Sequence, residues 1–483
     1  MKEEVIIGLE IHIQLMTKAK MFCHCSNDYI GKSPNTNTCP VCLGLPGSLP
    51  VLNKKVVEFA VRTAVALNCE INPISKFHRK NYFYPDLPKA YQISQYDLPL
   101  GRNGYMEILL PKNRENRRIR ITRVHIEEDA GKLVHEGDIA SSSYSLVDYN
   151  RCGIPLAEIV TEPDFRSPEE ARIFLVQLRS IVQHLGVCDG NMEEGSMRCD
   201  ANISLRDANS TTLGTKTEIK NMNSFKAVKK ALQFEVNRQK MLLTEGTEII
   251  QETRHWDESK NITVSMRSKE EAHDYRYFPE PDLLPLKVDL KMTDEISRNL
   301  PELPEARRER FINSYQIPEY DAEILTSSKA LGDFYEKAAS LYSNSKVLSN
   351  WIMGELIRYL NENKVGIEDS PISPEKLVEM LRLIDEGVIS GKMAKDVFEK
   401  MFETGEDASK IVKENGMTQI TDKNELFEVI DRVIKENSGS VKDFKQGKEK
   451  ALHYLVGQVM RYTKGRAKPD FVFEAIKQRV KKE

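Results

Sequence analysis

The feature that most constrains the fold of this sequence is a change of pattern over residues 279–304. Before it, short stretches that alternate between apolar and polar residues are broken by Gly, Pro and Asn, as in β-strands joined by turns. The change runs from Pro279-Glu280-Pro281-Asp282 to Leu300-Pro301-Glu302-Leu303-Pro304, whose prolines are typical of a linker. After it, helix signals follow one another to the end. The sequence therefore predicts an α+β region followed by helices alone.

The expected domains follow from this change and from the length of the chain. A chain of 483 residues is too long for one core. We expect an α+β cradle domain at residues 1–295, built on a mixed or antiparallel sheet. An all-helical middle domain is expected at residues 296–405 and a small helical tail domain at residues 406–483. The second boundary is placed near Gly405, after which a compact group of short helices is expected.

Individual elements are predicted from the spacing of apolar residues. Strands are expected at Val5–Leu15, Arg118–Ile126, Ser145–Tyr149, Ala201–Leu205 and Thr215–Lys220. Two helices are expected among them, one after Ser167-Pro168-Glu169-Glu170, which offers an N-cap and a first-turn proline, and one at Phe225–Leu243. The later helices are expected at Pro304–Tyr315, Asp321–Thr326, Lys329–Tyr342, Ser345–Asn361, Ser373–Glu386, Ser390–Thr404 and Asp407–Asn415.

Four of the eight cysteines form two close pairs, Cys23-His24-Cys25 and Cys39-Pro40-Val41-Cys42. A Cys-X-X-Cys turn places two thiolates on one side of a bend, and a second pair completes a tetrahedral zinc shell. The alternative is four unrelated buried cysteines or an oxidised pair. Because four sulfurs leave no open coordination position, Cys23, Cys25, Cys39 and Cys42 are expected to hold a structural Zn²⁺ in a loop at residues 23–42.

The first predicted strand has one polar and one apolar face. Glu10, His12 and Gln14 alternate with Leu9, Ile11, Ile13 and Leu15. A polar face of this kind is often only solvent-exposed, so a metal-binding role needs support from other residues.

Carboxylates that could join it lie in three other segments of the sequence. In Glu127-Glu128-Asp129, alternation places Glu127 on the face of His125 and Glu128 on that of Ile126, although such a run is commonly a solvated turn. Glu158 lies within Val147–Glu162, and Asp200 within Glu193–Asn202. Carboxylates and an imidazole from several strands would suit Mg²⁺, which often bridges to substrate phosphates.

The sequence lacks the motifs of several other chemistries. It has no GxxxxGK[ST] loop, no GxGxxG after a strand and no GxSxG elbow. A standard phosphate loop and a serine amidase centre are therefore not expected.

Two segments carry side chains suited to nucleic acid. Phe77–Asp86 interleaves basic and aromatic residues, which stack on unpaired bases or contact phosphate; an aromatic turn packed on the core is the alternative. Lysines 442, 445, 448 and 450 precede the apolar helix Ala451–Tyr462, where a solvated face is the alternative. Since the formal net charge is -3, nucleic acid must be met by local basic surface.

Several long sequence segments together resemble the GatB family, the B subunits of the aspartyl/glutamyl-tRNA(Asn/Gln) amidotransferases. They run essentially from end to end: Ile7–His12, Arg79–Asp86, Tyr91–Gln95, His125–Lys132, Val147–Glu162, Met192–Asn202, Asp274–Asp282 and Ala451–Gly465. Cys152 departs from the small hydroxyl residue or Gln usual in the family, and we give it no catalytic role. The four-cysteine cluster occurs in only some relatives, which supports a structural role for it.

The resemblance implies a ligase that acts on misacylated tRNA in two steps. ATP phosphorylates the side-chain carboxylate of Glu-tRNA(Gln) or Asp-tRNA(Asn), and ammonia then displaces phosphate. The implied partners are an amidase (A) subunit that releases ammonia from glutamine, a small (C) subunit that completes a heterotrimer, the misacylated tRNA and the cognate aminoacyl-tRNA synthetase. A separate amidase chain would account for the absent serine motif.

The resemblance also implies the site residues and cofactors. For Mg²⁺ the expected ligands are His12, Glu127 and Glu158, with Glu10, Glu128 and Asp200 as further catalytic residues. Glu127 is preferred over Glu128 because it shares the face of His125. The expected substrate-binding residues are Lys80, Tyr82, Arg198 and Lys216, and the expected cofactors are ATP, Mg²⁺ and structural Zn²⁺.

Two other functions remain open at this point. One is a zinc-containing tRNA-binding protein without chemistry of its own, and the other is a metal-dependent ligase for free amino acids. The expected location is the cytoplasm without membrane contact, because the N-terminus is acidic and no apolar run approaches the roughly 20 residues of a membrane helix.

Overall fold

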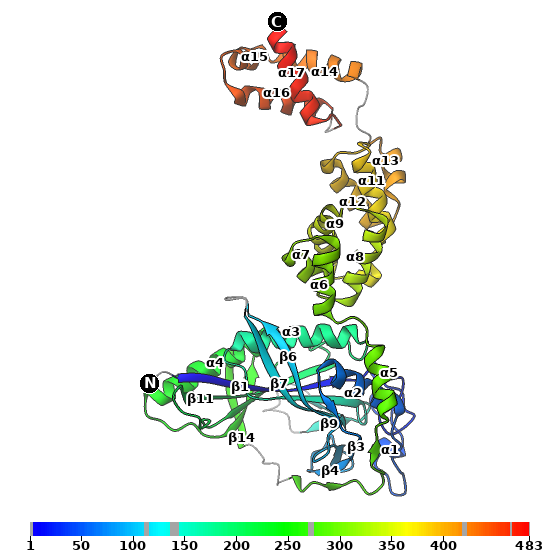
Figure 1. Ribbon diagram of the computed structural model, residues 1–483, viewed down its shortest axis with the longest axis vertical. Coiled ribbons are helices and arrows are strands. Elements are labelled where there is room, and N and C mark those ends of the chain that lie inside the picture. The colour runs from blue at the N-terminus through cyan, green and yellow to red at the C-terminus, as the bar shows by residue number, and fades with distance from the viewer. Residues whose placement is uncertain are drawn as a thin grey trace. The chain divides into compact units, whose positions relative to one another are not determined.

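The computed structural model describes residues 3–110, 115–135, 144–268, 275–417, 423–463 and 466–482 (Figure 1). Asp274 and Gly465, each at one end of a segment that resembles the family, lie outside these residues. The chain forms two compact units, Met1–Pro304 and Glu305–Glu483, and each is described by itself. Among the described residues, no helix is both long enough and apolar enough to span a bilayer.

The first unit contains every strand of the described residues. They are β1 (Glu3–Gln14), β2 (Glu70–Ile71), β3 (Ile74–Ser75), β4 (His78–Asn81), β5 (Tyr91–Ser94), β6 (Gly101–Leu109), β7 (Asn116–Glu128), β8 (Lys132–His135), β9 (Ser145–Asp148), β10 (Pro155–Thr161), β11 (Met197–Asp207), β12 (Thr217–Lys220), β13 (Glu252–Asp257), β14 (Ile262–Ser268), β15 (Phe278–Pro279) and β16 (Leu286–Lys287). Its helices are α1 (Pro40–Leu43), α2 (Lys54–Ala66), α3 (Pro168–His184), α4 (Phe225–Thr244) and α5 (Leu290–Arg298).

Nine strands form one large sheet in the order β14-β13-β12-β11-β1-β10-β7-β6-β2. All neighbours are antiparallel except β12 and β13, which are parallel. The sheet is therefore mixed, and the predicted α+β class with a mixed sheet is confirmed. The N-terminal strand β1 lies near its centre, between β10 and β11.

One face of the large sheet is covered by α3 and α4 (Figure 1). The side chains of Leu9, Ile11 and Ile13 on β1 are at most 1% exposed and join a core with Phe174 of α3 and Leu232 of α4. Each helix begins at a serine N-cap, Ser167 accepting from the amide of residue 170 and Ser224 from that of residue 227. The apolar face of β1 therefore meets the helices, which leaves its polar face for the opposite side of the sheet.

A small sheet in the order β15-β4-β5 lies on that opposite side (Figure 1). It brings residues far apart in sequence together, since Arg79 of β4 pairs with Phe278 of β15 and with Ile93 of β5. The Arg79 guanidinium also binds both carboxylate oxygens of the buried Glu280, at 2.7 and 2.8 Å. These contacts fix β4 close to the polar face of the large sheet, where β5 meets β7.

The second unit is helical. Its helices are α6 (Pro304–Tyr315), α7 (Glu319–Leu325), α8 (Lys329–Leu341), α9 (Ser345–Trp351), α10 (Ile357–Asn363), α11 (Pro374–Asp385), α12 (Gly391–Thr404), α13 (Ala408–Glu414), α14 (Lys423–Glu436), α15 (Ser438–Lys445), α16 (Glu449–Tyr462) and α17 (Pro469–Lys482). A π-helical turn, Ile352–Leu356, joins α9 to α10, and a 3-10 turn at Ile367–Asp369 precedes α11.

The second unit holds two apolar cores. One runs from Phe311 to Val412 and the other from Leu426 to Val480. The first of these cores continues past Gly405, because Ala408, Ile411 and Val412 of α13 are at most 4% exposed within it.

Candidate active site and metal-binding clusters

A row of charged side chains crosses the polar face of the large sheet. The strand register pairs His125 of β7 with Glu158 of β10, Glu158 with His12 of β1, and His12 with Arg198 of β11. Directly opposed residues in a sheet lie on the same face with their Cβ atoms about 5 Å apart. The register therefore gathers residues separated by more than a hundred positions in the sequence.

His12 lies at the centre of this cluster. Its Nε2 atom is 3.2 Å from Glu127, 3.3 Å from Glu158 and 4.0 Å from Glu10. Ser94 donates a hydrogen bond to the other oxygen of Glu127 at 3.1 Å, which fixes that carboxylate. His12, Glu127 and Glu158, which were predicted as one ligand set, are thus brought into contact.

The carboxylates of Glu10, Glu127 and Glu158 surround one imidazole, so positively charged groups are needed between them to offset their mutual repulsion. Burial by itself lowers the pKa of His12, but its hydrogen bonds to Glu127 and Glu158 raise that pKa well above the usual value. Burial by itself raises the pKa of Glu158, but the charge of His125 and the hydrogen bond from His12 lower it well below its usual value. For Glu10, the charge of Glu158 is the main cause of a raised pKa.

The donor atoms of this cluster fit a divalent cation. Two groups, Glu10-His12-Glu158 and His125-Glu127-Glu158, each place one ligand atom per residue within 4.8 Å of the others. A cation at this place would supply the positive charge that the imidazolium protons otherwise provide. The carboxylate oxygens of the cluster are the kind of ligand that a hard ion prefers. Both groups share Glu158, which makes this carboxylate the common member of the cluster.

A second row extends the polar face towards β12. Glu10 of β1 is opposite Asp200 of β11, and the ammonium of Lys220 on β12 forms an ion pair with Asp200. Burial by itself lowers the pKa of Lys220, but the charges of Asp200 and Glu218 raise it above its usual value. Lys220 therefore stays charged beside the cluster.

Lys80 of β4 faces the cluster from the small sheet. Burial by itself lowers its pKa, but the charges of Glu127 and Glu158 hold that pKa above its usual value. The Lys80 ammonium also lies 5.9 Å from the ring centre of Tyr82. Two charged lysines, Lys80 and Lys220, thus flank the carboxylates from different elements, a placement suited to phosphate or carboxylate groups of a substrate.

Arg198 is engaged by a buried carboxylate. Its two terminal nitrogens donate to Asp129 at 2.9 and 3.1 Å, and Gln14 donates to the same side chain at 3.2 Å. Burial raises the pKa of Asp129, but the charges of Arg198 and Arg151 lower it below its usual value. Asp129 therefore holds Gln14 of β1 and Arg198 of β11 in place at one edge of the cluster.

The Asp129→Asn substitution is expected to lower the free energy of unfolding by about 2 kcal/mol, because it removes a charged acceptor from two arginines. Urea unfolding of the purified chain measures this loss. The Glu107→Gln substitution is the control, since its partner Arg118 is 57% exposed and such surface pairs contribute about 0–1 kcal/mol. Equal losses in the two variants would contradict a special place for Asp129.

Two of the expected residues lie elsewhere. Glu128 points away from His12 and pairs with Lys89, and it accepts the backbone N–H of Ile93 at 2.9 Å. Lys216 is exposed just before β12, whereas the lysine of that strand that binds Asp200 is Lys220. The structure thus places Glu127, rather than Glu128, beside His12.

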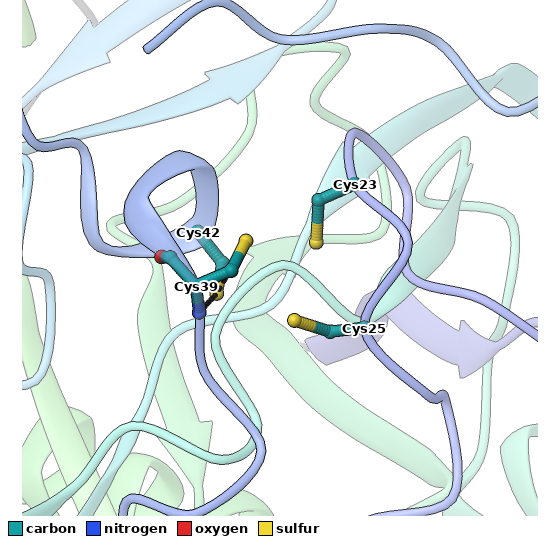
Figure 2. Close-up of side chains that lie close together, drawn as sticks. All are labelled: Cys23, Cys25, Cys39 and Cys42. Carbon is teal, nitrogen blue, oxygen red and sulfur yellow. Dashed lines mark hydrogen bonds between the residues drawn. The ribbon is translucent and has the colours of Figure 1, made fainter.

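The four cysteines of the predicted zinc loop converge (Figure 2). The Sγ atoms of Cys23, Cys25, Cys39 and Cys42 lie within 4.8 Å of one another, and those of Cys39 and Cys42 are 3.8 Å apart. Tetrahedral Zn²⁺ with bonds near 2.3 Å places its sulfurs about 3.8 Å apart. The arrangement therefore fits a structural zinc ion.

The surroundings of Cys42 favour its thiolate form. The backbone N–H of Cys39 donates to the sulfur of Cys42 at 3.0 Å, and the buried Lys20 ammonium lies 3.9 Å from that sulfur. The hydrogen bond from Cys23, with the Lys20 charge adding to it, lowers the pKa of Cys42 to about 5. The short helix α1 ends at Gly44, whose φ of 66° is left-handed and suits glycine.

Several residues of the site were not predicted as functional. His125 is 3% exposed and lies 3.3 Å from Glu158, and Arg123 lies 3.6 Å from the same carboxylate. The alternation that placed His125 on the face of Glu127 was the available signal. For Lys220 no sequence signal was available, because its approach to Asp200 depends on the pairing of β11 with β12.

Known proteins resemble this chain over its whole length. Residues 5–294 match the family model described as the GatB/GatE catalytic domain, and residues 333–480 match the GatB domain. The chain is 57% identical over 479 residues to a protein of Carboxydothermus hydrogenoformans that is named as the B subunit of aspartyl/glutamyl-tRNA(Asn/Gln) amidotransferase, covering 99% of both. Proteins of the same name from Caldanaerobacter subterraneus subsp. tengcongensis and Thermodesulfovibrio yellowstonii are 57% and 54% identical, over 100% and 99% of both chains.

Proposed function

Because the chain belongs to the GatB family, whose curated members are named as B subunits of aspartyl/glutamyl-tRNA(Asn/Gln) amidotransferase, we propose that it amidates Glu on tRNA(Gln), Asp on tRNA(Asn) or both. The observation that carries the proposal is the cluster of Glu10, His12, Glu127 and Glu158 on the polar face of the sheet. A protein that only binds tRNA has no need of three carboxylates around a partly buried imidazole.

The chemistry begins with an unreactive group. An oxygen of the substrate's side-chain carboxylate attacks the γ-phosphorus of ATP, and ADP leaves, which gives an acyl phosphate. The nitrogen of ammonia then attacks the acyl carbon, inorganic phosphate leaves and a proton is released. Activation is needed because a carboxylate is a poor electrophile whereas phosphate is a good leaving group.

In this proposal the carboxylate cluster holds Mg²⁺. Glu10, His12, Glu127 and Glu158 are the ligands, and Asp200 keeps Lys220 beside them. The bound ion offsets negative charge on the phosphate oxygens. Lys80 and Lys220 face substrate phosphate or carboxylate, whereas Arg198 acts by holding Asp129. A role for Lys216 or Glu128 in substrate binding or catalysis stays a prediction.

The proposed assembly includes two further chains. An amidase (A) subunit supplies ammonia from glutamine, and a small (C) subunit joins the two. Support comes from the name of the relatives, which designates one subunit of several, and from the lack of a serine amidase motif in the sequence. Co-expression with both partner chains, followed by an amidation assay on both misacylated tRNAs, tests the function. An assembly that amidates neither tRNA with glutamine or free ammonia would overturn it.

The proposed structural ion is Zn²⁺, held by Cys23, Cys25, Cys39 and Cys42. Its support is the convergence of the four sulfurs and the charge of the buried Lys20 beside them. A closed shell of thiolates fixes the loop at residues 23–42 to the rest of the α+β domain and takes no part in the chemistry.

The helices after Met417 are proposed to bind tRNA. A chain that ends at Met417 is expected to lose at least about tenfold in tRNA affinity, because the lysines near α15 and α16 contact phosphate. It keeps α13, whereas a chain ending at Gly405 would remove Ala408, Ile411 and Val412 from their core. Filter binding at fixed salt measures the affinity. Unchanged affinity with an intact fold would contradict the proposed role.

A further inference from the structure

Four tyrosines from three segments form a continuous row beside the candidate active site. The ring centres of Tyr82 and Tyr275 are 5.8 Å apart, and those of Tyr275 and Tyr277 are 6.0 Å apart, both edge to face. Tyr277 then stacks on Tyr96 at 4.4 Å with an interplanar angle of 7°. The row is therefore a preformed aromatic surface.

The row adjoins a polar hollow, and two lysines that line it also lie near the carboxylates. Lys80, Tyr82, Phe83, Lys220, Tyr275 and Arg276 line most of this hollow, which is open to solvent. The Lys80 ammonium lies 4.8 Å from the ring centre of Tyr275, and Lys220 binds Asp200 at the edge of the cluster. Aromatic rings and two cations thus face the same space.

Full burial in the core does not account for the aromatic side chains here: Tyr82, Tyr275 and Tyr277 are only half-buried, and their neighbours are exposed. Phe83 is 83% exposed, Tyr96 52% and Tyr84 43%. Arg276, between two tyrosines of the row, has a φ of 44°, which is left-handed and unfavourable for a residue with a Cβ. Asn81 holds this turn by donating to the carbonyl of Arg276 at 2.9 Å. Strained backbone is often found at binding sites, and here it joins two half-buried rings of the row.

We propose that this row of tyrosines, with Phe83, binds the base of an adenosine whose phosphate side is directed towards Lys80 and Lys220. Every base presents a flat face that stacks on aromatic rings, and lysines provide the charge for phosphate. The identification of adenosine rests on the proposed function, in which both ATP and the 3′-terminal residue of tRNA supply one. The two sources share this chemistry and are separated by the test.

The test uses the complete three-subunit assembly with two variants of this chain. Tyr275→Ala removes a ring of the row, and Phe83→Ala removes a ring too exposed to affect folding. Tyr275→Phe keeps the ring and should retain binding. Tyr105→Ala is the control, because that ring lies on β6 against Arg118. The probes are ADP with Mg²⁺, by calorimetry, and tRNA(Gln) with or without its terminal adenosine, by filter binding.

If the source is ATP, Tyr275→Ala and Phe83→Ala should weaken ADP binding by about 5- to 150-fold, the loss expected for one stacking contact. If the source is the tRNA end, the same variants should abolish the preference for the tRNA that carries its terminal adenosine. Unchanged ADP affinity together with an unchanged preference would overturn the proposal. A wild-type assembly that binds adenosine in this ring-dependent way yet amidates neither tRNA would support the site and contradict only the proposed function.

Discussion

Replacing Glu158 by glutamine is expected to lower ATP-dependent amidation by about 10³-fold or more, the order of loss when a preorganised charged contact is removed. Glu158 is 4% exposed and belongs to both groups of possible metal ligands. Its amide would neither bind a hard cation well nor balance the charges of His12 and His125. Free ammonia as nitrogen donor restricts the assay to the chemistry of this chain.

The affinity of the Glu158→Gln assembly for tRNA is expected to stay within about twofold of wild type, since the helices after Met417 are proposed to supply most of the phosphate contacts. The matched control is Glu258→Gln, whose carboxylate is exposed in the turn between β13 and β14. Thermal unfolding verifies that both variants are folded. Full activity of a folded Glu158→Gln assembly would refute the role of this carboxylate.

Removing one thiolate from the cysteine cluster is expected to release the zinc ion and to cost about 4 kcal/mol or more of unfolding free energy, because loss of a structural metal is among the most destabilising changes. In Cys42→Ser the bound zinc should fall from about one per chain to nearly none. The destabilisation arises in the loop at residues 23–42, where Lys20 would keep a buried charge without its thiolate partner.

Elemental analysis and urea unfolding measure these two effects. The control is Cys69→Ser, because Cys69 lies on its own near β6 and outside the cluster. Limited proteolysis should show cleavage near residues 23–50 in Cys42→Ser and not in the control. A wild-type chain that is fully folded without zinc would remove the zinc site from the proposal.

Features that depend on local spacing were predictable from the sequence. The alternation of β1 placed Leu9, Ile11 and Ile13 on the helix-covered face, as observed. Ser167, the N-cap of α3, and Pro168, its first residue, marked the first turn of that helix. Alternation also put Glu127 and His125 on one face, and the structure places both side chains near Glu158.

Features that depend on strand pairing were not predictable. Val147–Glu162 was recognised as a segment that resembles the family, yet β10 within it was not predicted as a strand. The register of β10 with β1 is what brings Glu158 to His12. Two features that do not depend on strand pairing were also missed: α2, and the π-helical turn at Ile352–Leu356 inside a helix predicted to be continuous. A single sequence contains no signal for which strands become neighbours.

The central place of β1 in the sheet has a consequence for how the chain folds during synthesis. Both neighbours of β1 emerge late, because β10 begins at Pro155 and β11 ends at Asp207. At about 5–20 residues per second, roughly 10–40 s pass between the synthesis of β1 and the completion of both strands that pair with it. During that interval β1 is an exposed, aggregation-prone edge, so the nascent chain is expected to depend on a chaperone such as one bound at the ribosome exit.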